Sequence, residues 1–454
     1  MTGSSFPLAA DTITAIATAP GRAAIALVRV SGPDALEIAK RVVLELDPNA
    51  ARVARLLSLR HPADGTLVDH GLVTVFQAPH SYTGEHVVEV SVHGGAIVPS
   101  LVLEAFIAAG ARHALPGEFT RRAVANGRMD LAQAEAIADL IDARSRMAHR
   151  VALSQLDGGL SRRTAELRDS VLDLEALIAY DIDFPEEDEG IVDRVRVAKK
   201  TAHTITELDQ LLGTADSGEM LRDGALIVIG GSPNAGKSSL FNALVGRQRA
   251  IVTDIPGTTR DAIEALVEIR GWPVRLVDTA GLRESRDVVE RLGIEISERY
   301  VTHADVVLLC AETDDELQTL ERRVTNLGSA PRVMVRTKAD LRSDLTAPGH
   351  ITLSALTGYG LDRLTAEISR LLSERFTAAA AEAPLLTRER HRQAVGAARA
   401  DLLAFREAWE RNEVPSSVAA IHLREAEHHL AELIGSVDVE DVLERVFSTF
   451  CIGK

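Results

Sequence analysis

Residues from about 11 to 120 alternate strand-like runs with helical ones. In residues 86–93 the two sides of a strand would be Val88, Val90 and Val92 against Glu89, Ser91 and His93. A second strand is predicted over residues 24–30, with Arg29 near its end. The polar side is either a solvated sheet surface or the wall of a polar ligand site. Half-exposed antiparallel sheets commonly show this pattern, which favours the solvated surface.

Helical periodicity dominates two regions that flank a different middle segment. The helical stretches are 119–180, 191–212, 387–409 and 418–450. The acidic run 181–189, which surrounds a proline, is most simply a solvated loop. Further breaks fall at Gly213 and at Asp223-Gly224. Helices on both sides of a different segment predict a helical domain that is split by an insertion.

The middle segment opens with an apolar strand, residues 225–229, and continues into a helical pattern over 239–245. Between them lies Gly231-Ser232-Pro233-Asn234-Ala235-Gly236-Lys237-Ser238, which fits G-x-x-x-x-G-K-[ST] in its usual strand-to-helix context. Such a loop turns backbone N–H groups and a helix N-terminus toward phosphates. We expect Lys237 to contact the β and γ phosphates and Ser238 to bind Mg²⁺.

The downstream elements follow in the order of a P-loop nucleotide-binding domain. A strand over 273–277 leads to Asp278, which fits the Walker B position beside Mg²⁺. The loop 257–261 offers Thr259 as a second protein ligand of Mg²⁺. Further strands are predicted over 305–310, 332–335 and 350–353. This order favours a nucleotide site over a chance match of the loop alone.

Guanine specificity is predicted from Thr337-Lys338-Ala339-Asp340. A carboxylate can accept hydrogen bonds from both the ring N–H and the exocyclic amine of guanine, and adenine offers no such pair. GTPases commonly have Asn where this chain has Thr337, so Asp340 is the expected discriminator. Lys338 is expected to pack its aliphatic stem over the base. The predicted GTP-binding residues are Asn234, Ala235, Gly236, Lys237, Ser238, Ser239, Thr253, Asp254, Ile255, Pro256, Gly257, Thr258, Thr259, Asp278, Thr279, Ala280, Gly281, Thr337, Lys338, Ala339, Asp340, Ser354, Ala355 and Leu356.

Leu282 stands where Ras-like GTPases carry a glutamine that orients the attacking water. Leucine cannot orient water, so hydrolysis is either slow or depends on other groups for the water and for a positive charge. Asn234 and the polar loop 253–259 could together hold a monovalent cation beside the phosphates. The alternative is that they are ordinary loop residues.

Composition excludes several classes of protein. Hydrophobic residues at 46% and charged residues at 26% describe a globular chain with no long apolar span. Its two cysteines, Cys310 and Cys451, form no C-x-x-C pair, which argues against a disulfide framework or a cysteine zinc site. A net charge of −16 argues against indiscriminate nucleic-acid binding, although a local patch could hold a specific RNA. We expect a soluble, cytoplasmic protein that binds no membrane.

The flanking regions resemble one family, the bacterial and mitochondrial tRNA modification GTPases known as MnmE or TrmE. The matching motifs are Ala19-Pro20-Gly21-Arg22, Arg29-Val30-Ser31-Gly32, Ser81-Tyr82-Thr83-Gly84-Glu85, His93-Gly94-Gly95, Pro116-Gly117-Glu118-Phe119-Thr120, Leu131-Ala132-Gln133-Ala134-Glu135-Ala136, Asp181-Ile182-Asp183-Phe184-Pro185 and Phe450-Cys451-Ile452-Gly453-Lys454. General GTPases share the middle segment but not these flanks.

The resemblance implies a multidomain α/β protein. Its parts would be an N-terminal α/β folate-binding and dimerisation domain over 1–120, an all-α helical domain over 121–222 plus 375–454, and an inserted Ras-like P-loop GTPase domain over 223–374. The family is a potassium-activated GTP hydrolase that forms a homodimer and a heterotetramer with the FAD-dependent MnmG. It uses a tetrahydrofolate derivative, the 5-formyl or 5,10-methylene form, to build a carboxymethylaminomethyl-type group at carbon 5 of the wobble uridine in certain tRNAs.

The resemblance also implies site residues. The K⁺ ligands would be Asn234, Thr253, Ile255 and Thr258, and the Mg²⁺ ligands Ser238 and Thr259. Glu290 would be the catalytic residue that orients water; by itself it would be taken for a solvated acid. The folate-binding residues would be Arg29, Glu89, Arg128 and Lys454, although many family members have lysine where Arg128 stands. For Cys451, covalent chemistry and simple packing both stay open.

A rival hypothesis is a potassium-type GTPase that acts as a ribosome-assembly or RNA-binding factor. Such factors usually carry a compact basic RNA-binding module. This chain has an acidic net charge and no G-x-x-G loop in a basic setting. A folate-binding scaffold with an inactive GTPase domain is disfavoured because Lys237, Ser238, Thr259 and Asp278 are present.

Overall fold

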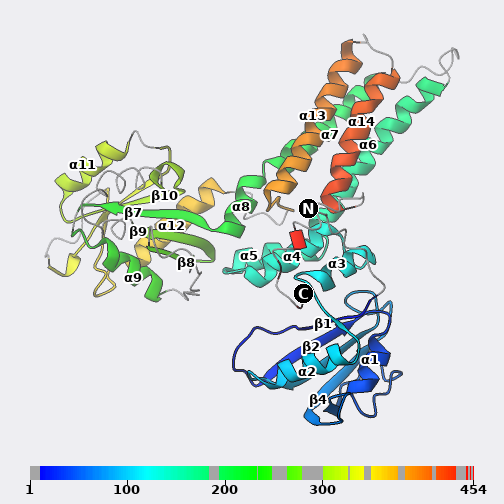
Figure 1. The fold of residues 1–454 in the computed structure, drawn as a ribbon. Coiled ribbons are helices and arrows are strands. Elements are labelled where there is room, and N and C mark those ends of the chain that lie inside the picture. Colours follow the sequence, from blue (N-terminus) through cyan, green and yellow to red (C-terminus); the bar gives the residue numbers. More distant parts are fainter. Residues whose placement is uncertain are drawn as a thin grey trace, which may run out of the picture. The chain divides into compact units, whose positions relative to one another are not determined.

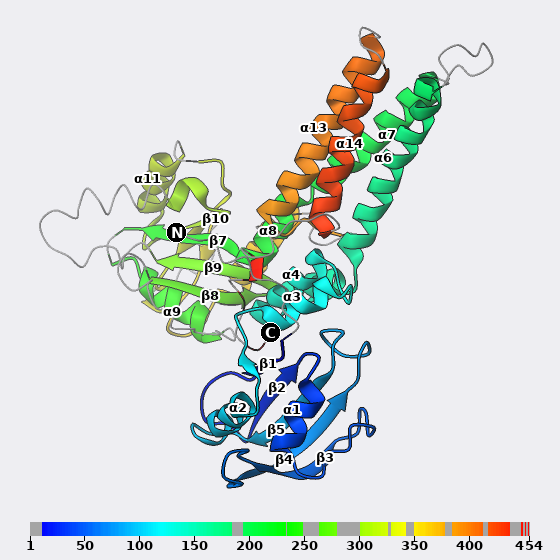
Figure 2. The same cartoon turned by 45° about the vertical axis from the view of Figure 1, so that its right-hand side comes forward.

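The computed structural model describes residues 11–183, 194–232, 234–247, 263–278, 300–325, 328–341, 349–376, 384–411, 416–435, 446–447, 450 and 453. The chain divides into two compact units, residues 1–138 with 434–454 and residues 139–433. Figures 1 and 2 show their helices and strands as ribbons.

A mixed sheet forms the first unit. Its strands are β1 (Ile13–Ile16), β2 (Ile25–Ser31), β3 (Arg55–Arg60), β4 (Leu67–Phe76), β5 (Val87–His93) and β6 (Arg112–His113), in the order β3-β4-β5-β2-β1-β6. Only the pairing of β1 with β6 is parallel. Helices α1 (Ala35–Val42) and α2 (Val98–Ala108) bury the valines of β5 on one face. The two predicted strands are thus confirmed as β2 and β5.

The opposite face of this sheet carries the polar positions of those strands. Arg29 faces Glu89 across β2 and β5, and Leu56 faces Leu72 across β3 and β4. Leu56 and Leu72 are 69% and 46% exposed, whereas the side chains of Arg29 and Glu89 are only 13% and 23% exposed. The favoured solvated interpretation is therefore wrong at the charged end of this face, which other side chains enclose.

Helix α3 (Glu118–Ala125) provides part of that enclosure. Its Phe119 is buried with Ile13 and Ala15 of β1, and Tyr82 packs against the same cluster. The C-terminal Phe447 and Phe450 pack on the first turns of α4 (Leu131–Asp142). Residues far apart in the sequence thus build one end of the sheet.

The second unit combines a helical bundle with a second sheet. Helices α6 (Gly159–Asp183), α7 (Arg194–Leu212), α13 (Glu389–Arg411) and α14 (Ser416–Ile434) run side by side in Figures 1 and 2. Their apolar stripes are buried, as Leu174, Leu208, Phe405 and Leu430 show. The shorter helices α5 (Arg146–Leu156) and α8 (Ala215–Asp223) complete the predicted helical region.

Two helical stretches differ from their predicted lengths. The stretch 119–180 is broken into α3, α4, α5 and α6, partly because Gly127 and Gly158 adopt positive φ. The predicted helix 418–450 ends at Ile434, because Gly435 takes a left-handed φ of 72°. A Cβ on Gly435 would lie 3.0 Å from the Cβ of Leu131, so this turn is decided by a contact distant in sequence.

The second sheet comprises β7 (Ala225–Gly231), β8 (Ile263–Ile269), β9 (Trp272–Asp278), β10 (Val306–Ala311), β11 (Arg332–Arg336) and β12 (Ile351–Thr352), in the order β12-β11-β10-β7-β9-β8. All pairings are parallel except the hairpin of β8 and β9. Helices α9 (Lys237–Arg247), α11 (Asp314–Val324) and α12 (Leu361–Arg375) flank it. Every strand predicted for the middle segment is confirmed.

The sheet begins and ends next to the bundle. Thr214 accepts a hydrogen bond from the backbone N–H of Leu386, and the Gln155 amide donates to the carbonyl of Leu385. The segments that enter and leave the sheet are therefore bonded to the same helical region, as an insertion requires. Among the described residues, no helix is long and apolar enough to cross a membrane.

Candidate functional site

The glycine-rich loop joins β7 to α9 in a conformation that large residues could not adopt. Gly231 has φ of 152°, and a Cβ there would lie 2.0 Å from the carbonyl oxygen of Cys310. Asn234 and Gly236 also have positive φ, 60° and 76°. The loop therefore passes close over the end of β10. Burial raises the pKa of the Cys310 thiol to about 12, so this cysteine packs and does not react.

Lys237 reaches back over the loop that precedes it. Its Nζ donates to the carbonyl oxygens of Gly231 and Ser232 at 3.1 and 2.7 Å, and the residue is 6% exposed. This pose holds an ammonium group at the concave side of the loop, where backbone N–H groups and the α9 N-terminus also favour anions. The position of the Lys237 ammonium group is therefore compatible with the predicted phosphate contact.

Ser238, in the first turn of α9, and Asp278, at the end of β9, come together. The Ser238 hydroxyl donates to Asp278 Oδ2 at 2.6 Å, and Asp278 is fully buried. A hydroxyl and a carboxylate at the phosphate end of a P-loop are the oxygen donors that Mg²⁺ uses there. The two residues thus suit a magnesium ion, and the assignment of Ser238 as its ligand stays a prediction.

The predicted base-recognition loop follows β11. The Asp340 carboxylate accepts a hydrogen bond of 2.5 Å from Ser354, which holds it in place. Thr337 donates through both its backbone N–H and its hydroxyl to the carbonyl oxygen of Ala311. That hydroxyl is used in holding β11 to β10, and the role of Asp340 in discriminating bases stays a prediction. Leu356 is 86% exposed beside this loop.

Of the four predicted folate residues, Arg29 and Glu89 meet in the first unit. Arg29 Nε and Nη2 contact Glu89 Oε1 at 2.9 and 2.8 Å, and Arg29 Nη1 donates to the carbonyl of Gly453 at 3.4 Å. The guanidinium lies 5.1 Å from the ring centre of Tyr82 and 5.6 Å from that of Phe119. Arg128 is exposed, and the structure shows no contact from it to the Arg29–Glu89 pair.

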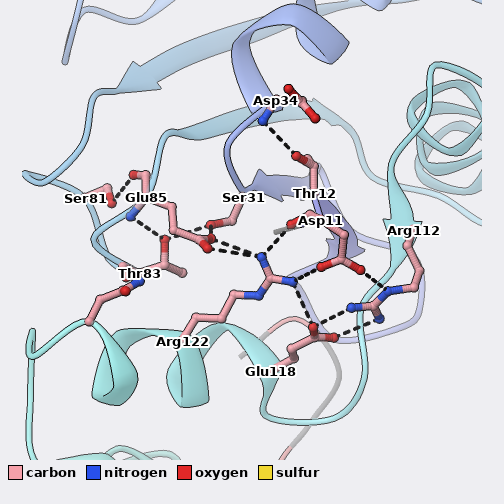
Figure 3. A network of polar contacts seen from close by, with 11 residues as sticks. Asp11, Thr12, Ser31, Asp34, Ser81, Thr83, Glu85, Arg112, Glu118 and Arg122 are labelled. Carbon is pink, nitrogen blue, oxygen red and sulfur yellow. Dashed lines mark hydrogen bonds and ion pairs between the residues drawn. The ribbon is translucent and has the colours of Figure 1, made fainter. Parts of the chain in front are cut away.

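A network of ion pairs lies beside that cluster (Figure 3). Arg122 contacts three carboxylates, those of Asp11, Glu85 and Glu118. Arg112 contacts Asp11 and Glu118 from the outer side. The Arg122 side chain is 5% exposed and that of Arg112 is 43% exposed. The network joins the chain before β1, the loop before β5, β6 and α3.

Acid will destabilise the first unit through this network. Burial alone would raise the pKa of Asp11 and Glu118, but Arg112 and Arg122 outweigh it and hold both pKa values below their ordinary range. A lowered folded-state pKa adds stability that is complete above the unfolded pKa and is lost as pH falls through the folded one. We expect hydrogen-exchange protection of α3 to be complete above about pH 5 and to decline as the pH falls below it, through the lowered pKa values of Asp11 and Glu118. Arg112→Gln should make this decline shallower, and a flat wild-type profile would contradict the prediction.

Comparison with known proteins adds to this geometry. Two family models match, the GTP-binding protein TrmE N-terminus over residues 12–128 and the MnmE helical domain over residues 131–451. The tRNA modification GTPase MnmE of Aquifex aeolicus is 40% identical over 453 residues, covering 98% of this chain and 100% of the relative. Those of Azoarcus sp. and Salinibacter ruber are 42% and 43% identical, covering 99% and 98% of this chain and 100% and 99% of theirs. The chain belongs to the MnmE family.

Membership in the MnmE family confirms the resemblance and the fold class. The chain contains a TrmE N-terminal α/β domain, a helical domain and a P-loop GTPase domain inserted within the helical region. It is a GTPase of the MnmE family, with GTP as its substrate.

Several predicted site residues of this MnmE-family chain lie outside the described residues. They are Thr253, Asp254, Ile255, Pro256, Gly257, Thr258, Thr259, Thr279, Ala280, Gly281, Glu290 and Lys454, together with Leu282 and Cys451. The described members, among them Asn234, Ala235, Gly236, Lys237, Ser238 and Ser239, surround the start of α9. Ala339, Asp340, Ser354 and Ala355 lie at the base-recognition loop.

Sequence reasoning missed two features of this MnmE-family chain. Glu312, directly after β10, forms an ion pair with Lys338, whose backbone has φ of 57°. An acid directly after a buried strand was the available signal. The second feature is the network around Arg122: Glu85 and Glu118 stood inside family motifs, but nothing in the sequence showed that they share a partner.

Proposed function

We propose that this chain is a potassium-activated GTP hydrolase that modifies tRNA. With an FAD-dependent partner, MnmG, it would use a one-carbon tetrahydrofolate to build the carboxymethylaminomethyl-type group at carbon 5 of wobble uridines. The observation that carries the proposal is the joint placement of Lys237, Ser238 and Asp278 at one end of the sheet, in a chain whose flanks match the MnmE family. The domain boundaries at 120, 222 and 374 stay predictions.

The test is the tRNA itself. Total tRNA from cells lacking this gene is digested and analysed by mass spectrometry for carbon-5-substituted wobble uridines. We expect these nucleosides to be lost, and to be restored by the wild-type gene but not by Lys237→Ala. If they persist in full, the proposal fails and the ribosome-assembly hypothesis becomes the one to test.

GTP hydrolysis in this proposal depends on groups that replace a glutamine and an arginine finger. Lys237 would neutralise the β and γ phosphates, and Mg²⁺, which stabilises the developing charge when bound, would be held by Ser238 and Thr259 with Asp278 beside it. Because Leu282 cannot orient water, Glu290 is the proposed group for that task. Potassium, with Asn234, Thr253, Ile255 and Thr258 as ligands, would supply the missing positive charge.

Replacing Asn234 with alanine should abolish the potassium stimulation. Asn234 is exposed on the loop with φ of 60°, so its side-chain oxygen is available to a cation beside the phosphates. Initial hydrolysis rates are compared in KCl and NaCl at equal ionic strength, with GTP affinity measured in parallel. We expect the KCl-to-NaCl rate ratio to fall to about one while GTP still binds. Equal stimulation in mutant and wild type would remove Asn234 from the potassium site.

The Arg29–Glu89 pair of the first unit supports a folate as the ligand of this domain. When bound, a one-carbon tetrahydrofolate would supply the carbon for the modification. Glu89 can accept hydrogen bonds from the guanidine-like edge of the pterin, and Arg29 can pair with a carboxylate. In this structure the two side chains pair with each other and are mostly enclosed. Arg128 and Lys454 would hold the glutamyl tail. Ligand binding would therefore exchange the Arg29–Glu89 pair for contacts to the folate.

A homodimer is supported by apolar side chains that are exposed on the same sheet. Ile25, Leu56 and Leu72 expose apolar side chains on one face, which a second copy would bury. We propose this homodimer, a heterotetramer with MnmG, and a cytoplasmic location with no membrane attachment. The acidic net charge of −16 means that tRNA contact would need a local basic surface.

A further inference from the structure

Arg122 gathers carboxylates from three separate parts of the first unit. Its Nη2 contacts Asp11 Oδ1 at 2.6 Å and Glu118 Oε1 at 3.0 Å, and its Nη1 contacts the Asp11 carbonyl at 2.8 Å and Glu85 at 3.2 and 3.3 Å. Figure 3 shows the guanidinium at the centre of these groups. With Arg112 included, two cations serve three carboxylates, so the network already carries an excess of one negative charge, and the removal of either cation increases that excess to two.

Two of the three carboxylates, those of Glu85 and Glu118, belong to the segments that carry the aromatic neighbours of Arg29. Glu85 ends the loop that contains Tyr82, and Ser31 and Thr83 add hydrogen bonds there. Glu118 directly precedes Phe119 at the start of α3. The Tyr82 hydroxyl and the Thr120 hydroxyl are bonded at 2.8 Å, which connects the loop to the helix.

The guanidinium of Arg29 lies near both rings. Its carbon is 5.1 Å from the ring centre of Tyr82 and 5.6 Å from that of Phe119, within the range of cation–π contact. These rings and Glu89 determine where Arg29 points. The position of Arg29 therefore depends on how the loop and α3 are held against each other.

We propose that Arg122 is a positioning residue for the folate site: by bonding Glu85 and Glu118 at once, it fixes Tyr82 and Phe119, and through them Arg29. This inference rests on the proposed folate-binding function. Arginine suits the task because its planar group donates in several fixed directions, whereas a lysine ammonium cannot serve the same set of acceptors from one point.

The chain offers a matched control. Arg112 bonds Asp11 and Glu118 in the same network but makes no ion pair with Glu85 in the structure, and it lies at the exposed end. Arg122→Lys and Arg112→Lys therefore make the same chemical change, because each replaces a guanidinium group of the network with an ammonium group. Only the first weakens the bond to the loop of Tyr82. A merely stabilising role would make the two variants alike once both are studied well below their unfolding temperatures.

Two readouts on the full-length protein test the inference. The chain has four tyrosines, and Tyr82 is the one within residues 1–138 and 434–454. After 3-fluorotyrosine labelling, its ¹⁹F resonance is assigned with Tyr82→Phe. The second readout is the Kd of 5-formyltetrahydrofolate. We expect Arg122→Lys to shift the Tyr82 resonance and to raise Kd about tenfold, a change of about 1.4 kcal/mol, while Arg112→Lys changes neither.

The outcomes are distinguishable. An unmoved Tyr82 resonance in Arg122→Lys, or an unchanged Kd beside a shifted resonance, would overturn the positioning role. Equal effects of the two lysine variants would assign the network to stability alone and overturn it as well. A wild-type protein that binds no folate would instead overturn the proposed folate function. If Arg122→Lys does not fold, Glu85→Gln weakens the same link and carries the same expectations.

Discussion

Lys237→Ala will reduce kcat/KM for GTP hydrolysis by on the order of 10²–10³-fold. The ammonium group lies against the loop carbonyls of Gly231 and Ser232, where the β and γ phosphates are expected. Among the residues that the structure describes, no other cationic side chain lies at this position to stabilise the charge that develops during phosphoryl transfer. Steady-state phosphate release with saturating Mg²⁺ measures the effect.

The control for that variant is Lys200→Ala. Lys200 pairs with Asp173 on the bundle and lies outside the nucleotide loop. Its replacement should leave turnover and nucleotide affinity unchanged. If Lys237→Ala hydrolyses GTP at the wild-type rate, the assignment of the phosphate site to this loop fails, whatever the tRNA experiment shows.

Asp340→Asn will change the preferred base from guanine to xanthine. The carboxylate, held by Ser354, can accept from both N–H groups of guanine. An asparagine would donate to one of those positions and repel the guanine amine. Xanthine has a carbonyl at that position and would pair instead. We expect kcat/KM for GTP to fall by on the order of 10²–10⁴-fold, with most activity recovered on XTP.

Competition binding with GDP and XDP separates base recognition from loss of folding. Asp315→Asn is the matched control, because Asp315 is an exposed acid in the first turn of α11. That variant should keep the preference for GDP. If Asp340→Asn weakens GDP and XDP equally, Asp340 is not the discriminating residue.

The nucleotide site was predictable because its geometry is local. A strand, a glycine-rich loop and a helix are adjacent in the chain, so their pattern of residues indicates where Lys237 and Ser238 must lie. Asp278 could be added because parallel strands of this fold place their carboxyl ends together. The long helices were predictable for a similar reason, since a 3.6-residue period is visible in the sequence alone.

The first unit was predictable only in part. The alternation in β5 predicted the strand and its buried valines, but not what covers its polar side. Enclosure of Arg29 and Glu89 depends on the register that places them opposite each other, and on Tyr82 and Phe119 from other segments. The pattern by itself therefore favoured a solvated surface where the fold makes a closed one.

The early end of α14 has a similar cause. The periodic pattern continues beyond Ile434, but Gly435 turns because its backbone lies against Leu131, some three hundred residues earlier in the chain. No local rule distinguishes this glycine from one that a helix tolerates.

The sequence by itself determined the family, the P-loop with Lys237 and Ser238, and the alternation of strands and helices, because each is expressed in neighbouring residues. The tertiary structure alone decided that Asp11, Glu85 and Glu118 meet at Arg122, that Arg29 pairs with Glu89, and that Glu312 holds Lys338. Buried charges need partners, but the partner's identity depends on which segments the fold brings together, and that information is spread over the whole chain.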